Sequence, residues 1–379
     1  MKLKLVADEN IPGIEDLLGP VAHITRVAGR DLQAEAVRDA DALFVRSVTQ
    51  VDAGLLEGSR VRFVGTATAG TDHIDKVWLR QQQIAFHSCA GSNANAVVEY
   101  VLAAIAETGD TLERLFAGAR VGIVGYGHVG RSLAARLDAL AIEWCAYDPW
   151  MDKGAIARPG TLADVNASDV ICIHAELTRR EPWPSHHLYD AAALDAIRSS
   201  QLLINASRGP VVDNAALKQR LSAANAPVAV LDVWEQEPQL DLELLELVRF
   251  GSAHIAGYSI DGKLRASRML AEALTGSLGL KPPVVGSATA PQLELGLGTG
   301  PADRAAVVRG LLGQVYRLAE DDQLLRSKAN DVPECIGTAF DELRRGYRQR
   351  RELAGAVLVG LRPQGFVRDI AAALGVLCA

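Results

Sequence analysis

The chain has 379 residues, of which 49% are hydrophobic, and it carries a formal net charge of −7. This length allows two or three folded domains, and the acidic balance argues against nucleic-acid and membrane-surface proteins, which need basic patches. The five cysteines form no CxxC pair, and no apolar run approaches the ~20 residues of a membrane-spanning helix. We therefore expect a soluble cytoplasmic protein with reduced cysteines and no metal site.

The first 93 residues alternate short apolar runs with helical patterns such as Leu32–Arg38 and Ala53–Leu56. This alternation predicts a parallel sheet with helices on its faces. No glycine-rich phosphate loop follows the first strand, so we do not expect this domain to hold a nucleotide. The predicted strands are Leu3–Val6, His23–Arg26, Ala42–Val45, Arg62–Gly65 and Ile84–His87.

A second alternating series begins after a helical pattern over Ala94–Glu107, which could connect two domains. It predicts a second doubly wound α/β domain over residues 94–257. A helix from about Lys263 to Leu280 follows and could return to the first domain. The predicted strands of the second series are Val121–Val124, Trp144–Tyr147, Val170–His174, Leu202–Asn205 and Val228–Val233.

A GxGxxG turn, formed by Gly125, Gly127 and Gly130, lies between the first strand of this series and an amphipathic helix. Glycine permits a tight turn and a close approach of the backbone to a pyrophosphate, and the helix N-terminus offers free N–H groups. Asp148 ends the next strand, roughly 20 residues downstream, where a carboxylate can bind the adenosine ribose. The pattern predicts dinucleotide binding, and the alternative is a purely structural strand–turn–helix.

Three later segments place polar residues directly after predicted strands, and they contain Arg208, Asp232 with Glu237, and His254. Each has an ordinary structural interpretation, because Arg208 could cap a helix and a lone histidine is often structural. The carboxylates could likewise belong to a solvated loop.

Together, behind a nucleotide turn, these residues form a set suited to hydride transfer. His254 can take the hydroxyl proton as hydride leaves the carbon, and Glu237 can orient the imidazole and stabilise its charged form. Arg208 can hold a substrate carboxylate with its planar guanidinium and polarise the reacting oxygen. Asp232 could face the nicotinamide carboxamide.

The order and spacing of these motifs resemble those of the D-isomer-specific 2-hydroxyacid dehydrogenase family. The family segments N-x-x-R-G, D-V-x-x-x-E-P and H-I-A-G are matched by Asn205–Gly209, Asp232–Pro238 and His254–Gly257. The resemblance implies an NAD-dependent enzyme with Arg208, Glu237 and His254 as catalytic residues. It also implies that residues 1–93, completed by 258–280, form the substrate domain, and that residues 94–257 form the Rossmann NAD-binding domain.

The resemblance also implies a set of cofactor-binding residues, spread over the strand ends of the second domain. The sequence departs from the family pattern at Glu176 and Ala253, where the family usually carries proline. The expected cofactor-binding residues are Gly125, Tyr126, Gly127, His128, Val129, Gly130, Asp148, Ala175, Ala206, Ser207, Asp232 and Gly257.

Three further segments resemble a branch of the family that acts on a phosphorylated 2-hydroxy acid: Phe44–Thr49, Gly65–Asp75 and Phe340–Tyr347. This resemblance implies that the substrate is contacted by Ser47, Thr66 and Tyr258, although ordinary β propensity also explains Thr66. The group that binds the substrate phosphate is left open, with Arg46 as the first candidate.

Residues 286–379 resemble an appended dimerisation domain of α+β type. A connector over Lys281–Gly286 and Leu293–Gly300 precedes helix patterns at 302–320 and 337–350 and an apolar run at Ala356–Leu361. The apolar stripe of the first pattern needs a partner, and so small a segment buries little within itself. We expect a homodimer, and the alternative is a monomer whose C-terminal segment folds back on its substrate domain. The stripe consists of Val307, Leu311, Val315 and Leu318.

The predicted fold is therefore α/β, with two doubly wound parallel-sheet domains and a small α+β C-terminal domain. The predicted function is NAD-dependent oxidation of a phosphorylated 2-hydroxy acid. One alternative is a dehydrogenase for another 2-hydroxy acid, such as phosphoglycerate or glycerate. Another is a nucleotide-sensing protein that binds NAD without turnover.

Overall fold

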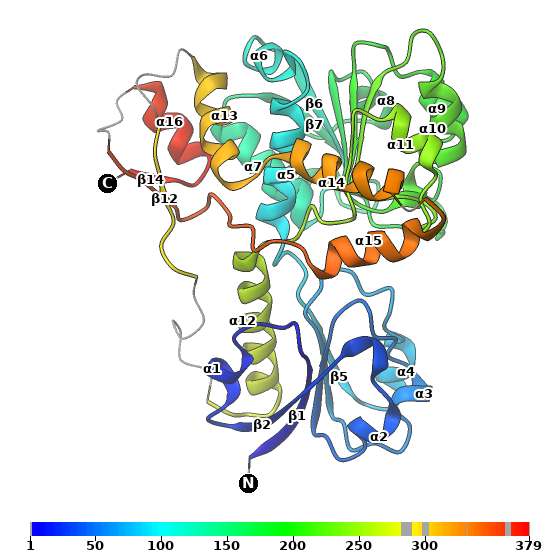
Figure 1. Cartoon of the computed structure of the whole chain (residues 1–379), viewed down its shortest axis with the longest axis vertical. Coiled ribbons are helices and arrows are strands. Elements are labelled where there is room, and N and C mark those ends of the chain that lie inside the picture. The colour runs from blue at the N-terminus through cyan, green and yellow to red at the C-terminus, as the bar shows by residue number, and fades with distance from the viewer. Residues whose placement is uncertain (1, 282–289, 298–302, 332, 361–364, 379) are drawn as a thin grey trace. The chain divides into compact units, whose positions relative to one another are not determined.

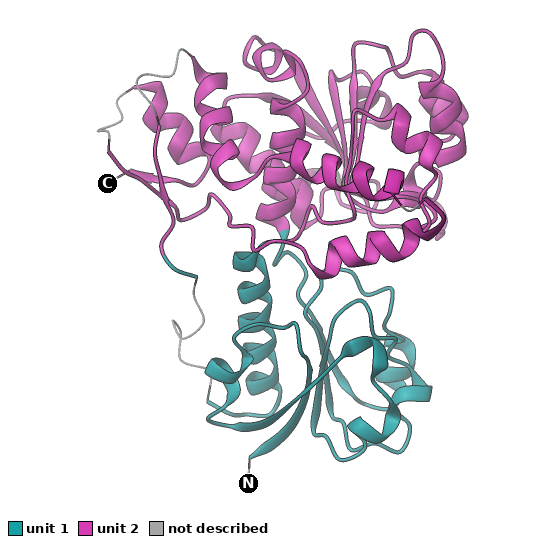
Figure 2. Ribbon diagram, viewed as in Figure 1, with its two compact units in different colours: residues 1–93, 259–291 teal, residues 94–258, 292–379 magenta. Residues whose placement is uncertain are grey.

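The computed structural model describes residues 2–281, 290–297, 303–331, 333–360 and 365–378 (Figure 1). Much of the predicted connector, at 282–289 and 298–302, lies outside the described residues. The chain divides into two compact units (Figure 2), of which unit 1 comprises residues 1–93 and 259–291. Unit 2 comprises residues 94–258 and 292–379.

Unit 1 is built on a five-stranded parallel sheet with the strand order β2-β1-β3-β4-β5. Successive side chains of a strand point to opposite faces, so Ala42 and Phe44 join one apolar layer, and Leu43 and Val45 join the other. The five predicted strands are confirmed within two residues at each end. They are β1 (Leu3–Asp8), β2 (Ala22–Val27), β3 (Ala42–Val45), β4 (Phe63–Thr66) and β5 (Ala85–Ser88).

Helices cover both faces of this sheet. One face carries α1 (Ile14–Leu18) and the long helix α12 (Ile260–Ser277), which comes from the distant second stretch of unit 1. Gly65 permits this packing, because a Cβ there would lie 2.6 Å from a methyl carbon of Leu270. The other face carries α2 (Ala34–Val37), α3 (Ala53–Leu56) and α4 (Lys76–Gln81).

Unit 2 contains a six-stranded parallel sheet with the order β11-β10-β9-β8-β6-β7. The five predicted strands are again present, and the two-residue strand β11 was not predicted. The strands are β6 (Arg120–Val124), β7 (Glu143–Tyr147), β8 (Val170–Ile173), β9 (Leu202–Asn205), β10 (Val228–Leu231) and β11 (Phe250–Gly251).

Two apolar layers enclose this second sheet. The layer on one face includes α5 (Ala94–Ala106), α6 (Thr111–Phe116) and α7 (His128–Ala139). The layer on the other face includes α8 (Leu162–Asn166), α9 (Ala191–Asp195), α10 (Asn214–Leu221) and α11 (Leu242–Leu247). Short 3₁₀ turns occur at Gly29–Asp31, Lys153–Ala155, Gly209–Val211 and Pro333–Cys335.

The described residues beyond 291 belong to unit 2 and form no separate compact unit. Helix α13 (Arg304–Val315) joins the layer of α5, together with α16 (Phe366–Ala373) and a small sheet. Helices α14 (Leu318–Asp331) and α15 (Ile336–Arg345) join the opposite layer. The small sheet has the order β12-β13-β14, formed by Glu294–Leu295, Val357–Leu358 and Leu377–Cys378.

The prediction of one helix over 302–320 is wrong, because the chain breaks between α13 and α14. Tyr316 is extended, with φ −151° and ψ 133°, and its buried ring packs on that of Tyr100 with centroids 6.0 Å apart. The Glu107 carboxylate then accepts the N–H groups of Leu318 and Ala319, which start α14. The helix predicted over 337–350 likewise ends early, at Arg345.

Among the described residues, none of the helices has both the length and the apolar character needed to cross a membrane. All five cysteines are free, and Cys145 and Cys172 are buried within strands as predicted.

Candidate active site

The three predicted catalytic residues follow three neighbouring strands of unit 2. Arg208 comes after β9, Glu237 after β10 and His254 after β11. Because these strands are parallel, their carboxyl ends meet at one edge of the sheet. Ligands of open α/β sheets bind at that edge.

His254 and Glu237 form a hydrogen-bonded pair, in which Nδ1 of the imidazole lies 2.7 Å from Oε2 of the carboxylate. The other carboxylate oxygen accepts the N–H of Trp234 at 2.9 Å. Burial alone would raise the pKa of Glu237, but the charge and hydrogen bond of His254 outweigh it, and the pKa lies below its usual value. An ionised Glu237 fixes the imidazole, so that Nε2 can accept a proton.

The backbone around His254 is held by Asp232. His254 has φ 54°, a left-handed conformation uncommon for non-glycine residues, and its N–H donates to the Asp232 carbonyl at 2.8 Å. The Asp232 carboxylate accepts hydrogen bonds from the Ser252 hydroxyl at 2.7 Å and from the N–H groups of Ile255 at 2.8 Å and Ala256 at 3.0 Å. Burial raises the pKa of Asp232. This carboxylate therefore fixes the His254 segment, a role that the sequence did not reveal.

Arg208 lies in a turn that depends on close backbone packing. A Cβ at the next residue, Gly209, would lie 2.0 Å from the carbonyl oxygen of Trp234, so glycine is needed there. The Asn205 amide donates to the Arg208 carbonyl at 3.0 Å, and Arg208 Nη1 donates to the Ser207 carbonyl at 2.8 Å. The turn thus holds Arg208 beside the segment that leads to Glu237.

The glycine turn after β6 has the shape that a pyrophosphate requires. Gly125 has φ 90°, and a Cβ there would lie 2.6 Å from the Cα of Ala175. A Cβ at Gly130 would lie 2.1 Å from the Gly125 carbonyl oxygen, whereas a Cβ at Gly127 would meet nothing within 4 Å. The backbone at Gly125 and Gly130 is therefore packed against other backbone atoms. At Gly127, directly before the N-terminus of α7, it has free space beside it. These features fit a dinucleotide.

Asp148 connects the end of β7 to the glycine turn. Its Oδ2 accepts the N–H of Tyr126 at 2.8 Å, and its Oδ1 accepts the N–H of Trp150 at 3.0 Å. In the turn itself His128 is exposed and Val129 is half-buried. The remaining predicted cofactor residues also follow strand ends of this sheet, and they are Ala175, Ala206, Ser207 and Gly257.

The three predicted substrate residues are divided between the units, with Ser47 and Thr66 in unit 1 and Tyr258 in unit 2. Ser47 is exposed after β3, and Thr66 is buried at the end of β4. The Thr66 hydroxyl lies 2.9 Å from Nε2 of His73, so it already has a protein partner. Arg46, the first candidate for the phosphate, donates from Nε to Asp8 at 2.8 Å.

Two side chains close to these residues were not predicted. His174 directly follows β8, and neither of its buried ring nitrogens has a hydrogen-bond partner among the described residues. Burial lowers the pKa of His174 to about 4. Arg344 of α15 has its guanidinium carbon 6.0 Å from the centre of the Tyr258 ring and interacts electrostatically with Glu237. Arg344 lies within Phe340–Tyr347, one of the segments that resemble the phosphorylated-acid branch, but its approach to this site depends on the tertiary fold that positions α15.

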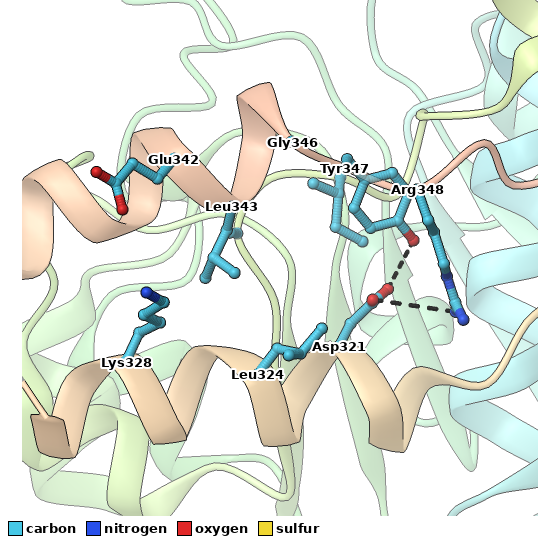
Figure 3. A pocket seen from close by; sticks show the side chains of 10 residues that line it. Asp321, Leu324, Lys328, Glu342, Leu343, Gly346, Tyr347 and Arg348 are labelled. Carbon is cyan, nitrogen blue, oxygen red and sulfur yellow. Dashed lines mark hydrogen bonds and ion pairs between the residues drawn. The ribbon is translucent and has the colours of Figure 1, made fainter.

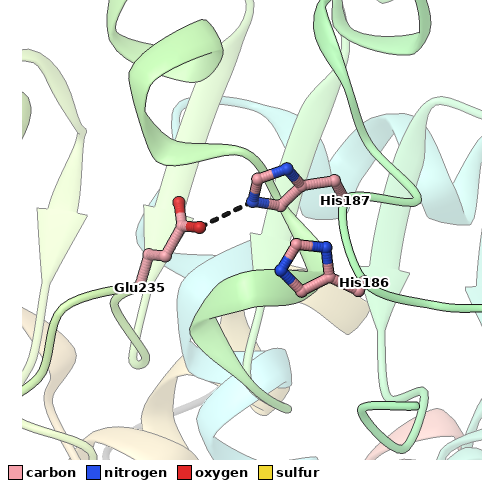
Figure 4. A group of neighbouring side chains, drawn as sticks. All are labelled: His186, His187 and Glu235. Atoms are coloured by element: carbon pink, nitrogen blue, oxygen red, sulfur yellow. Dashed lines mark hydrogen bonds and ion pairs between the residues drawn. The ribbon is translucent and has the colours of Figure 1, made fainter. Parts of the chain in front are cut away.

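His186, His187 and Glu235 form a compact group in which one ligand atom of each lies within 4.8 Å of the others (Figure 4). Nε2 of His187 is 2.6 Å from Oε1 of Glu235, and Oε2 of Glu235 accepts the N–H of Asn214 at 3.1 Å. Both carboxylate oxygens are thus engaged in hydrogen bonds that tie the His187 loop to the Glu235 segment. The expectation of no metal site stays a prediction.

Comparison with known proteins gives a consistent result. Residues 95–256 match the family model described as D-isomer specific 2-hydroxyacid dehydrogenase, NAD binding domain. The chain is 44% identical to the erythronate-4-phosphate dehydrogenase of Cellvibrio japonicus, over 92% of this chain and 93% of that protein. It is 42% identical to the Klebsiella pneumoniae protein of the same name, over 92% of each chain.

A solved structure shares the fold. The D-lactate dehydrogenase of Aquifex aeolicus, complexed with NAD and lactic acid, aligns with a TM-score of 0.58 and 20% identity. The alignment covers 74% of this chain and 99% of that one.

Proposed function

The chain belongs to the erythronate-4-phosphate dehydrogenase family, and from this premise we propose that it oxidises 4-phospho-D-erythronate at its 2-hydroxyl group with NAD. The product is (R)-3-hydroxy-2-oxo-4-phosphooxybutanoate, in the biosynthesis of pyridoxal 5'-phosphate (vitamin B6). The His254–Glu237 pair, at 2.7 Å on the same sheet edge as Arg208, is the observation that carries the proposal.

The protein residues divide the chemistry between them. NAD, when bound by the Gly125–Gly130 turn and Asp148, supplies the hydride acceptor. Nε2 of His254 takes the proton of the 2-hydroxyl group as the hydride leaves the same carbon, so a C=O bond forms. Glu237 stabilises the resulting imidazolium, and Arg208 holds the C1 carboxylate and polarises the reacting oxygen.

An assay of NADH formation tests the proposal against both alternatives. The purified protein is given NAD with 4-phospho-D-erythronate, 3-phosphoglycerate or glycerate in parallel. We expect kcat/KM for phosphoerythronate to be at least about 100-fold higher than for the other two acids. A site whose polar groups match those of its substrate discriminates strongly against acids that leave those groups unpaired. A preference for another acid would reassign the substrate. NAD binding without turnover of any of the three would instead indicate a nucleotide-sensing protein.

We also propose that the protein acts as a homodimer in the cytoplasm. Three large apolar side chains of the C-terminal segment are exposed: Leu324 by 54%, Phe366 by 40% and Leu377 by 57%. Exposed apolar groups of this kind favour association, and twofold pairing is the commonest form. Five free cysteines agree with a reducing compartment.

A further inference from the structure

We propose that Arg344, on helix α15 of the C-terminal segment, binds the phosphate group of the substrate with its guanidinium. The inference rests on the proposed function and assigns the phosphate group, for which the catalytic residues provide no partner. It gives the C-terminal segment a part in substrate recognition within the same chain.

Helix α15 directs Arg344 toward the candidate active site. Its apolar side is buried through Ile336, Ala339 and Phe340, and Arg344 is one turn beyond Phe340 on that side. The guanidinium carbon lies 5.8 Å from the centre of the Phe340 ring and 6.0 Å from that of Tyr258. The neighbouring Arg345 is exposed. Only the first arginine of this pair is therefore aimed inward.

The contacts of Arg344 connect it to predicted substrate and catalytic residues. Its guanidinium carbon lies 6.0 Å from the centre of the Tyr258 ring, which in turn packs edge-on against the Tyr347 ring with centroids 5.8 Å apart. The charges of Glu237 and Asp232 act on it. The carboxylate that pairs with His254 and the aspartate that holds the His254 backbone are thus both close enough to interact electrostatically with this cation.

The charge of Arg344 is incompletely compensated by its surroundings. Its Nε is buried and has no hydrogen-bond partner among the described residues. Glu237 already bonds His254 and Trp234, and Asp232 already accepts three hydrogen bonds from the residues at 252–256. A guanidinium with a buried, unused donor is costly unless an anion satisfies that donor. A bound phosphate would supply that anion.

Phosphate recognition suits this side chain. A guanidinium binds phosphate oxygens through parallel N–H groups. In 4-phosphoerythronate the phosphate is carried two carbons beyond the reacting carbon, so it needs a cation other than Arg208, which serves the carboxylate. Arg46 is less suited, because its Nε is already committed to Asp8.

The full-length Arg344→Met variant tests the proposal by its discrimination between 4-phospho-D-erythronate and unphosphorylated erythronate. We expect KM for the phosphorylated substrate to rise about 100-fold and the ratio of the two kcat/KM values to fall by a similar factor. Inorganic phosphate should inhibit erythronate oxidation by the unmodified enzyme and lose this effect in the variant. Arg345→Met is the matched control and should behave like the unmodified enzyme.

Arg344→Lys keeps the charge without the planar fork, and we expect it to raise KM for phosphoerythronate about 10-fold. This lysine variant tests the proposal even if Arg344→Met fails to fold. An unchanged KM for phosphoerythronate in the lysine variant would overturn the proposal. Equal losses of kcat with both substrates, with a shifted rate–pH profile, would also overturn it, since Arg344 would then act through Glu237. An unmodified enzyme that does not prefer the phosphorylated acid would instead refute the proposed function itself.

Discussion

At the scale of the residue, the proposed proton transfer uses a histidine whose backbone is constrained and whose ring is held by one carboxylate. Replacing His254 with Asn should preserve NAD binding but lower kcat by about 10²–10⁴. The Glu237→Gln variant should shift the acidic limb of the rate–pH profile to lower pH, because the imidazole loses the carboxylate that stabilises its charged form. Steady-state kinetics and an NAD fluorescence titration measure both effects. Turnover near normal in His254→Asn would assign the proton to another residue.

His174 gives the folded protein a sensitivity to acid. Its ring nitrogens are buried without partners among the described residues, and its pKa is lowered by burial to about 4. Because the unfolded chain binds the proton more tightly, with a pKa near 6.5, protonation favours unfolding. The contribution of neutral His174 to the free energy of unfolding is fully present above about pH 6.5. It is lost as the pH falls toward 4, by up to about 3 kcal/mol.

Urea unfolding of the unmodified protein and of His174→Gln at pH 7.5, 6 and about 5 would measure this contribution. The variant should show a shallower loss of stability between these values. Parallel curves for the two proteins would show that the acid sensitivity comes from other groups.

At the scale of the element, Gly127 in the turn after β6 and Gly209 in the turn after β9 are glycines for different reasons. Gly209→Ala should destabilise the protein by about 2 kcal/mol or more, because the added Cβ would meet a backbone carbonyl at 2.0 Å. Gly127→Ala should leave the unfolding free energy nearly unchanged, since that Cβ would meet nothing within 4 Å, but it should weaken NAD binding. Denaturation without NAD, followed by an NAD titration, distinguishes them. Equal destabilisation by both variants would contradict this interpretation.

The strands were predictable because each is a short apolar run bounded by turn residues, as in Ala42–Val45 and Leu202–Asn205. The break between α13 and α14 was not, because the apolar periodicity continues through it. The break is caused by tertiary contacts of Tyr316, whose ring packs on Tyr100 and lies 3.8 Å beneath the guanidinium carbon of Arg350. Both partners are distant in sequence.

The candidate site was predictable where a motif carries the chemistry, as it does for the His254–Glu237 hydrogen bond, which the structure contains. The sequence could not show whether Asp232 binds the cofactor or holds the protein backbone, because a carboxylate directly after a strand is expected for either role. Nor could the sequence predict that Arg344 lies close to Tyr258. Such contacts depend on packing between distant elements, which local patterns do not encode.

At the scale of the whole molecule, the C-terminal segment completes the core of unit 2. Helix α5 is buried on nearly all sides, and Glu99 within it lies 3.6 Å from Arg350 and accepts the N–H of Leu353 at 2.7 Å. Burial raises the pKa of Glu99 to about 7. Removing residues beyond Gly286 would therefore expose an apolar face and a buried carboxylate. A truncated chain is thus a poor test of dimerisation, because it should unfold or aggregate.

Surface substitutions offer a cleaner test of the proposed homodimer. Leu324 is exposed on α14 and borders a cavity of about 350 Å³ between α14 and α15, with Leu343 and Tyr347 on the opposite side (Figure 3). A charge at an apolar interface is costly, so Leu324→Asp combined with Leu377→Asp should raise the dimer dissociation constant by about 100-fold or more.

Sedimentation velocity from about 0.1 to 50 μM would measure the dissociation constant. Val77→Asp is the control, because Val77 is 65% exposed on α4 in unit 1, outside the C-terminal segment. The control should remain a dimer, and the double variant should dissociate. The melting temperature of the double variant at low concentration should equal that of the unmodified chain, which would show that its monomer is intact. Sedimentation of the unmodified chain as a monomer throughout would exclude the dimer. Dissociation in the Val77 variant alone would place the interface in unit 1, because only a charge buried between the two copies would separate them.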